Sequence, residues 1–346
     1  MNSGGAPPGL ARGRDRTDSA ATMSEAEPDV RPRCWILSDG RAGAETQSVA
    51  LAEALGLAAE VKALRIRAPW RWLPPALWCA PRLAVEGGGS LLAPPWPRVL
   101  IASGRLTAAP AAALRRAARG ATLAVQIQDP RIDPRSFDLL VVPGHDRLGG
   151  PNVLTTRGAL TRITPARLAA AAARWGPRFA HLPRPRVAVL IGGPNRAYGM
   201  GPRTARRLAG EVAALARDQG AGLMVTASRR SGAETQAILR AALAGLPAVV
   251  WDGSGENPYW GYLGLADAIL VTADSVTMVS EAAGTGKPVH VMQLDGGSAK
   301  FDRFHRGLGD AGITRPFRGR LECWDYPPLD ETARIAAEIQ RRLDLF

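Results

Sequence analysis

The sequence has few of the residues that bind metals or form disulfides. It contains three cysteines and four histidines in 346 residues. Cys34, Cys79 and Cys323 are far apart and odd in number, which excludes a disulfide framework and a cysteine-rich metal site. The histidines have no ligand spacing, and no Asp-x-Asp pair is present to hold a metal against a diphosphate. We therefore expect no metal site and no cofactor, in a reducing cytoplasm.

Long apolar segments are also missing, because Arg, Asp, Glu or Pro interrupts every apolar stretch. No segment reaches the roughly 20 apolar residues that a spanning helix needs. Residues 1–32 are polar, rich in Gly and Pro, and lack the apolar core of a signal peptide. We expect this tail to be disordered and the protein to be cytoplasmic, without integral membrane segments.

Lysine is scarce, with three residues, yet the formal net charge is +13. Nearly all of the positive charge is therefore arginine. Such an excess favours anionic partners such as nucleotides or phospholipid head groups. The sequence shows no basic run interleaved with aromatics, no zinc knuckle and no helix-turn-helix pattern, so we expect no nucleic acid partner.

Short apolar segments alternate with helix-like segments twice along the chain. The first set spans residues 33–165 and the second spans residues 186–325, and such alternation is typical of a parallel sheet covered by helices. The segment between them predicts a helix and a linker rich in Pro and Arg. Residues 326–346 predict an amphipathic helix that packs back across the two halves. We expect an α/β protein with two Rossmann-like domains facing a central cleft, where such folds bind small ligands.

The segment "VTADSVTMVSEAAGTGKPVHVM" ends in a Gly-Lys pair that resembles an ATPase phosphate loop. Glu281 stands where the first Gly should be, and Pro288 follows Lys287, which excludes that motif. The segment instead predicts a strand, a helix capped by Asp274 or Ser275, and another strand. Free amides at such a helix start favour an anion. Glu281, about two turns further, could accept hydrogen bonds from a ribose.

Polar residues follow the predicted strands of the second half. Each alone fits a turn or a helix cap, but together they predict a ligand-binding edge of the sheet. These residues are Gly192, Gly193, Asn195, Thr226, Ser228, Arg229, Asn257, Asp274, Ser275, Ser280 and Glu281.

In the first half, Gly40, Arg41 and Gly43 resemble a loop that tolerates phosphate, although the loop lacks the Gly-x-Gly-x-x-Gly spacing of a dinucleotide fold. Serine hydrolysis is excluded because no Gly-x-Ser-x-Gly motif is present. His145 and Asp39 each follow a predicted strand and are alternative candidates for a catalytic base.

Two further segments leave alternatives open. "KFDRFHRGL", from Lys300, is either a solvated loop with apolar anchors or an anion clamp over the cleft. Trp70, Trp72, Trp78 and Trp96 lie among four arginines, and they either pack in the core or contact a membrane interface.

Several motifs together resemble one family. They are "WILSDGRAGAETQSVALAEALG", "VLIGGPNRAYG", "TASRRSG", "NPYWGYLGLADAILVTADSVTMVSEAAGTGKPVHV" and "KFDRFHRGLGDAGITRPF". They are similar to the mitochondrial fission Elm family, whose bacterial members are described as dependent on nucleoside-diphosphate sugars. The resemblance spans about Cys34 to Phe317.

The resemblance implies a GT-B-like fold, in which the second domain holds most of a sugar nucleotide. It implies a diphosphate near Gly192, Gly193, Ser228, Arg229 and Ser275, and a ribose contact from Glu281. We therefore expect a metal-independent glycosyltransferase that uses a nucleoside-diphosphate sugar and an envelope or lipid-linked acceptor at the inner face of the membrane. The alternative is a non-catalytic, membrane-associated adaptor, and fold alone does not choose between them.

Overall fold

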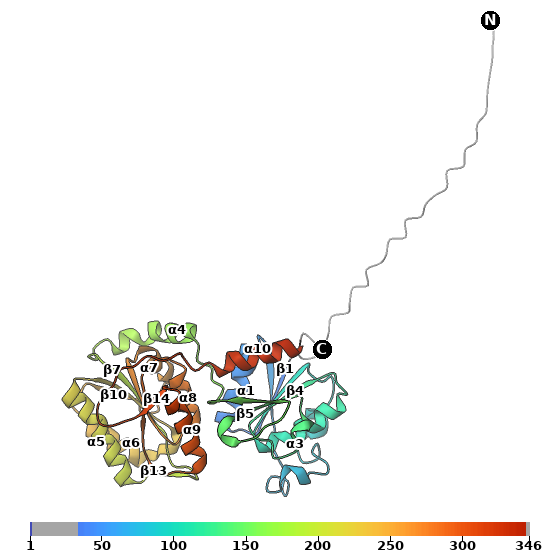
Figure 1. The fold of residues 1–346 in the computed structure, drawn as a ribbon, viewed down its shortest axis with the longest axis horizontal. Coiled ribbons are helices and arrows are strands. Elements are labelled where there is room, and N and C mark those ends of the chain that lie inside the picture. The colour runs from blue at the N-terminus through green and yellow to red at the C-terminus, as the bar shows by residue number, and fades with distance from the viewer. Residues whose placement is uncertain (2–33, 344–346) are drawn as a thin grey trace. The chain divides into compact units, whose positions relative to one another are not determined.

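The computed structural model describes Met1 and residues 34–343, whose helices and strands are shown in Figure 1. The predicted disordered tail, residues 1–32, lies outside the described residues except for Met1. From Cys34 onward the chain contains two parallel sheets of six strands each, with helices between the strands. This confirms the predicted α/β class with two Rossmann-like halves.

The first sheet has the strand order β2-β1-β3-β4-β5-β6, and all of its pairs are parallel. Its strands are β1 (Cys34–Ser38), β2 (Ala59–Ala63), β3 (Val99–Ser103), β4 (Leu123–Ile127), β5 (Leu139–Pro143) and β6 (Val153–Thr156). Helices α1 (Ala42–Ala54), α2 (Gly88–Leu91) and α3 (Arg105–Ala117) connect them, with 3-10 turns at Pro75–Leu77, Pro134–Ser136 and Gly144–Asp146.

Both faces of the first sheet are apolar, as expected for a sheet that is covered on two sides. Successive strand residues alternate between two clusters: Cys34 and Ile36 lie in one, and Trp35 and Leu37 in the other. Val99, Leu123 and Leu139 belong to the first cluster, together with Leu51 of α1. Ala108, Ala111 and Leu114 of α3 belong to the second.

The second sheet has the order β10-β9-β7-β11-β12-β14, again parallel throughout. Its strands are β7 (Arg186–Ile191), β9 (Gly222–Ala227), β10 (Ala248–Val250), β11 (Ala268–Thr272), β12 (Val289–Met292) and β14 (Thr314–Pro316). The helices are α4 (Pro165–Trp175), α5 (Pro202–Gln219), α6 (Gly232–Leu243), α7 (Tyr259–Leu265), α8 (Val276–Ala283) and α9 (Ala299–Asp310). Strands β8 (Tyr198–Gly199) and β13 (Asp295–Gly296) form a small antiparallel pair, and 3-10 turns cover Gly176–Phe179 and Arg229–Ser231.

The segment between the two predicted halves packs on the second sheet. Trp175 and Phe179 stack at 5.9 Å between ring centroids and belong to the second core, where Phe179 also meets Tyr262 of α7. Only the part of this segment outside α4 connects the two halves, because the apolar face of α4 packs against the second core. "KFDRFHRGL" forms most of α9, with Phe304 and Leu308 buried, so the expected loop is a helix.

The last helix, α10 (Glu331–Leu343), returns to the first sheet after the second is complete. Its Ile335, Ala336 and Ile339 are buried in the first cluster beside α1 (Figure 1). This confirms the prediction that the C-terminal helix packs back on the other half. None of the helices in residues 34–343 is long and apolar enough to cross a membrane.

Candidate functional site

Three loops at the carboxyl edge of the second sheet are joined by the Asp274 carboxylate. Its Oδ1 accepts a hydrogen bond from Thr272 Oγ1 at 2.7 Å, and its Oδ2 accepts from the backbone N–H of Gly193 at 3.0 Å. Arg230 Nη2 donates to the same Oδ2 at 3.0 Å. The Asp274 side chain is fully buried. The loops after β7, β9 and β11 are therefore held together by charge-assisted bonds inside the protein.

Glycine allows these loops to approach one another. A Cβ at position 192 would lie 2.1 Å from Asp274 Oδ1, and a Cβ at position 193 would lie 2.5 Å from the Arg230 carbonyl carbon. The Gly192 N–H donates to Thr272 Oγ1 at 2.7 Å. Both predicted diphosphate-binding amides thus have partners within the chain.

Helix α8 begins as the sequence predicts. Ser275 is its N-cap and accepts a hydrogen bond from the Met278 N–H at 3.3 Å. A Cβ at Gly43 in the first turn of α1 would lie 3.6 Å from Thr277 Oγ1 in the first turn of α8. The first turns of two helices, one from each half, therefore lie in contact, and helix starts favour anions.

Glu281 lies on α8 and is paired with a tyrosine. Tyr259 OH donates to Glu281 Oε2 at 2.5 Å. Burial raises the pKa of Glu281 to about 7, although the Tyr259 hydrogen bond lowers it. A carboxyl group with such a pKa is half protonated near neutral pH. The Glu281 carboxylate already accepts one hydrogen bond from a hydroxyl group.

Two other residues of the same segment hold the fold together. Ser280 is fully buried, and its Oγ accepts the Ala159 N–H at 2.9 Å. It therefore joins α8 to the chain that follows β6. Lys287 donates to the carbonyls of Leu263 and Gly264 at the end of α7, which agrees with the exclusion of an ATPase loop.

The remaining predicted residues of the second half lie at the ends of β7, β9 and β10. Asn195 Nδ2 donates to the Asp274 carbonyl at 3.0 Å, and Asn257 Oδ1 accepts the Tyr259 N–H at 3.0 Å. Thr226 is buried at the end of β9. Ser228 Oγ lies 3.3 Å from Ser231 Oγ, and the adjacent Arg229 is exposed. The next residue, Arg230, is the arginine that contacts Asp274.

In the first half, the loop after β1 is closed by short-range bonds. Gly40 has a φ of 80°, and its N–H donates to Ser38 Oγ at 3.1 Å. The Arg41 N–H donates to Asp39 Oδ1 at 3.2 Å. The Asp39 side chain is 3% exposed, while that of Arg41 is 63% exposed. Arg41 Nε lies 3.4 Å from Asp39 Oδ2, so Arg41 is an exposed guanidinium paired with Asp39 beside the start of α1.

His145 follows β5 and is nearly enclosed. Its side chain is 4% exposed and its Nδ1 has no hydrogen-bond partner. The pKa of His145 is lowered to about 4, mainly by burial. The Asp146 carboxylate opposes this shift, while the charges of Lys300 and Arg303 add to it. The imidazole is therefore neutral at pH 7. Because β3 and β4 lie between β1 and β5, His145 and Asp39 are about three strand spacings apart, roughly 14 Å, and do not form a dyad.

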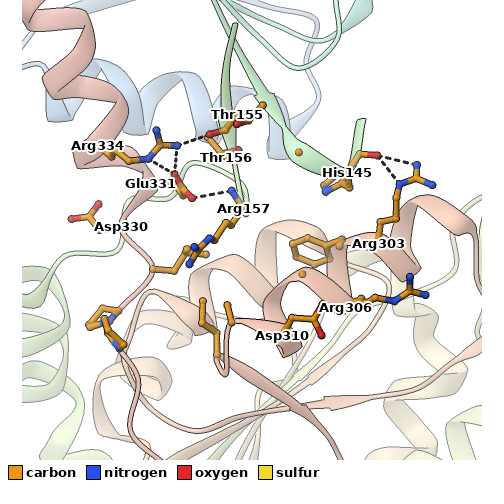
Figure 2. Close-up of a pocket in the computed structure, with 18 residues that line it drawn as sticks. His145, Thr155, Thr156, Arg157, Arg303, Arg306, Asp310, Asp330, Glu331 and Arg334 are labelled. Carbon is orange, nitrogen blue, oxygen red and sulfur yellow. Dashed lines mark hydrogen bonds and ion pairs between the residues drawn. The ribbon is translucent and has the colours of Figure 1, made fainter. Parts of the chain in front are cut away.

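A cavity of about 870 Å³ lies beside His145. Figure 2 shows Thr155, Arg157 and His145 on one side of it and Arg306 and Asp310 of α9 on the other. Four arginines and three carboxylates line it: Arg157, Arg303, Arg306, Arg334, Asp310, Asp330 and Glu331. Such a volume is typical of a small-molecule site, and the mixed charges suit a polar ligand.

Contacts across the cavity connect the two halves. Arg303 donates through Nε and Nη2 to the His145 carbonyl at 3.1 and 2.9 Å. Glu331 accepts from the Arg157 N–H at 2.8 Å and also pairs with Arg334. The sequence analysis singled out His145 as a candidate base, and it included Arg303 and Arg306 in the segment offered as an anion clamp. It missed the other charged lining residues, because they become neighbours only when distant segments fold together.

Sequence comparisons identify relatives across most of the chain. The family model described as mitochondrial fission ELM1 matches residues 42–343. The mitochondrial fission protein ELM1 of Arabidopsis thaliana is 35% identical over 274 residues, covering 71% of this chain and 64% of that protein. An uncharacterized protein of Rickettsia prowazekii is 27% identical over 289 residues, covering 72% and 80%. The chain thus spans less than two thirds of the plant protein's length.

Solved structures share the fold at low identity. The UDP-GlcNAc 2-epimerase from Methanocaldococcus jannaschii has a TM-score of 0.51 and 10% identity, covering 89% of this chain and 99% of that one. Os79 from O. sativa, solved in complex with UDP, has a TM-score of 0.51 and 11% identity, covering 90% and 92%. These similarities show a GT-B-like fold.

Proposed function

Because the chain belongs to the mitochondrial fission ELM1 family, we propose that its GT-B-like fold serves a glycosyltransferase that uses a nucleoside-diphosphate sugar. One observation carries the proposal: the first turns of α1 and α8 lie in contact beside the joined loops of the second sheet. Two adjacent helix starts from opposite halves favour a diphosphate beside them. The UDP in the Os79 structure provides a chemical precedent on this fold.

The diphosphate is assigned to the start of α8, to the exposed Arg41 and to Arg229. The amides of Gly192 and Gly193 are engaged with Thr272 and Asp274, so in this proposal they position the loops. Asp274 likewise positions Arg230, whose side chain is 45% exposed. Guanidinium groups would stabilise the negative charge of the leaving diphosphate without a metal.

Glu281 is assigned to the ribose. Its hydrogen bond with Tyr259 would break when the ribose binds. Its Oε2 already accepts a hydrogen bond from the Tyr259 hydroxyl, and a ribose hydroxyl could donate the same type of bond in its place. The other predicted residues support the surrounding loops in this assignment, because they are buried or form hydrogen bonds with neighbouring protein groups. They are Ser280, Asn195, Thr226, Ser228 and Asn257.

The acceptor is assigned to the first half. His145 lines the 870 Å³ cavity, and its neutral ring can accept a proton from a hydroxyl, although a pKa of about 4 makes it a weak base. Asp39 is the alternative base, because it lies beside the start of α1, whose first turn contacts that of α8. An envelope or lipid-linked acceptor would bring the protein to the cytoplasmic face of a membrane.

A second function class is a non-catalytic, membrane-associated adaptor of the same fold. It is favoured by the hydrogen bonds at the second-sheet edge. There the Asp274 carboxylate and the amides of Gly192 and Gly193 already have partners in neighbouring loops. An adaptor would keep these bonds for stability alone, without binding a nucleotide.

Thermal unfolding of the full chain with UDP, GDP and ADP distinguishes the two classes. A bound nucleotide raises the midpoint of unfolding, by about 2.7 kcal/mol of stability at a hundredfold excess over Kd. Arg229→Gln should remove much of this rise without changing the stability of the free protein, since Arg229 is exposed. Arg206→Gln on α5 is the matched control, because Arg206 is also exposed. No rise at millimolar nucleotide would favour the adaptor.

The ribose assignment has its own test. Glu281→Ala should abolish any nucleotide-dependent rise, whereas Tyr259→Phe should keep it, because the carboxylate then has no competing hydroxyl. A rise that survives in Glu281→Ala would remove Glu281 from the site.

A further inference from the structure

The connection between β2 and β3, residues 64–98, exposes an unusual amount of apolar surface. Trp72, Leu77 and Leu83 are 72%, 61% and 67% exposed. Elsewhere in the described residues, the only large hydrophobic side chains exposed in this way are Met1 and Val61. Single exposed apolar residues are common on proteins, but three within twelve residues suggest a contact surface.

The structure changes which tryptophan contributes to this surface. Trp78 is 5% exposed and its Nε1 donates to the Leu73 carbonyl at 3.3 Å. Trp96 is partly buried, with its Nε1 donating to the Leu92 carbonyl at 3.1 Å. Trp70 packs against the small cluster formed by Trp78, Ala84 and Ala109. Of the four tryptophans, only Trp72 is exposed.

The exposed side chains stand on a fixed backbone. Arg105 at the start of α3 donates from Nη1 to the Leu73 carbonyl at 3.0 Å and from Nη2 to the Arg71 carbonyl at 2.8 Å. An antiparallel bridge joins Ile66 to Val85. The buried cluster of Trp78, Ala84 and Ala109 anchors the same connection.

Positive charge surrounds these apolar side chains. Residues 64–98 contain five arginines and a single carboxylate, Glu86. Arg65, Arg67 and Arg71 are exposed, while Arg82 is engaged with the Leu92 carbonyl. A second copy of the chain would bring like charges together at a two-fold interface, which disfavours self-association here. The phosphates of an anionic bilayer complement the same charges.

We propose that Trp72, Leu77 and Leu83 enter the interface of an anionic membrane while Arg65, Arg67 and Arg71 contact lipid phosphates. Indole and leucine side chains gain free energy in the interfacial region, and nearby guanidinium groups add electrostatic attraction. The surface deepens the proposed function by naming the route to a lipid-linked acceptor, yet it does not depend on nucleotide binding. Its failure and that of the transferase assignment are therefore separable.

Vesicle flotation of the full chain tests the proposal. Vesicles of phosphatidylcholine with roughly 30% phosphatidylglycerol should bind the protein, and pure phosphatidylcholine should bind it roughly a hundredfold more weakly, because each arginine near an anionic surface contributes attraction. Arg65→Gln, Arg67→Gln and Arg71→Gln together should remove this preference. Arg116→Gln, Arg203→Gln and Arg206→Gln together are the matched control, because these exposed arginines lie on α3 and α5.

The apolar part is tested separately. Trp72→Ser, Leu77→Ser and Leu83→Ser together should weaken flotation at least about tenfold, since most of the inserted area is lost. Val61→Ser is the control, because Val61 is exposed but lies outside the connection. The triple variant should unfold at the same temperature as the parent, since its three side chains lie mainly in solvent.

The cysteines provide a positional reporter. Cys79 lies within the connection, Cys323 lies far from it, both are exposed, and Cys34 is buried. A polarity-sensitive dye on Cys79, in a Cys323→Ser variant, should shift to the blue with anionic vesicles, while a dye on Cys323 in a Cys79→Ser variant should not. Unchanged flotation of the triple serine variant would overturn the proposal, as would a response at Cys323 alone. So would a dimer that the serine variant abolishes, because a second copy would then cover the surface.

Discussion

The carboxyl edges of the two sheets differ in how their polar side chains are bonded. At the second edge, the Asp274 carboxylate accepts from Thr272, Gly193 and Arg230. At the first edge, buried polar atoms without a hydrogen bond occur at or just after four neighbouring strands. They are Asp39 Oδ2, Ser103 Oγ, Gln126 Oε1 and His145 Nδ1, beside β1, β3, β4 and β5.

Backbone conformation shows the same contrast. Gln128, Arg131 and Arg147 have φ values of 68°, 60° and 58°, and all three follow strands β4 and β5 of the first sheet. Left-handed conformations are costly for such residues and occur often near functional sites. At the second edge, the loops approach one another closely because positions 192 and 193 are glycines without a Cβ. The second edge is thus organised around one shared carboxylate, whereas the first has four polar atoms without a hydrogen-bond partner in the described residues. At the second edge, His305 has one such atom, Nδ1, although its Nε2 lies 2.8 Å from the Ala273 carbonyl oxygen.

The largest expected effect comes from Asp274, which follows β11. Asp39, which follows β1, is its counterpart at the first edge. Asp274→Asn should lower the free energy of unfolding by about 4 kcal/mol, because Arg230 and the Gly193 N–H lose a buried anion. Asp39→Asn is the matched variant at the first edge and should cost about 1 kcal/mol, since only Arg41 contacts that carboxylate. Denaturant unfolding at pH 7 measures both. Equal losses of unfolding free energy in the two variants would contradict the difference between the two edges.

A smaller effect concerns the pH dependence at Glu281. Its pKa of about 7 lies above the ordinary 4.5, so the folded state binds this proton more tightly than the unfolded state. The free energy of unfolding should therefore fall as pH rises from about 4.5 to 7, by about 3 kcal/mol in total. Glu281→Gln should lack this fall, and urea titrations at pH 5 and pH 8 measure the difference from the parent.

Tyr259→Phe sharpens that measurement. The hydrogen bond from Tyr259 lowers the Glu281 pKa, so its loss should move the fall to higher pH. An identical pH dependence of the parent and Glu281→Gln would remove the buried carboxyl as the cause.

The smallest effect compares two buried serines. Ser280→Ala should lower stability by about 1–2 kcal/mol, because the buried Ala159 N–H loses its acceptor. Ser103→Ala should be neutral or slightly stabilising, since the Ser103 Oγ has no partner to lose. Thermal unfolding of both variants checks the sign, and a larger loss for Ser103→Ala would reverse the proposed difference between the edges.

Much of the fold could be predicted because its signals are local. Apolar runs such as Val99–Ser103 and Ala268–Thr272 are strands in the structure, and Ser275 caps α8 through a bond three residues away. The family resemblance is confirmed for the same reason, since long motifs remain contiguous in sequence.

The candidate site could be predicted only in part. Sequence alone does not distinguish Arg229 from Arg230, because the turn after β9 decides which guanidinium reaches Asp274. Sequence alone does not show that the Ser280 hydroxyl accepts the Ala159 N–H, because the two residues lie 121 positions apart. Trp78 and Trp72 have similar local contexts, yet only Trp72 is exposed.

The sequence by itself determined the alternation of strands and helices, the caps, the glycines that permit close loops and the excess of arginine. Those properties depend on neighbours within one or two turns of chain. Only the tertiary structure decided which polar atoms have partners, which arginine is engaged and which tryptophan faces outward. Those outcomes depend on contacts between residues far apart in sequence, where burial and hydrogen bonding are settled by packing.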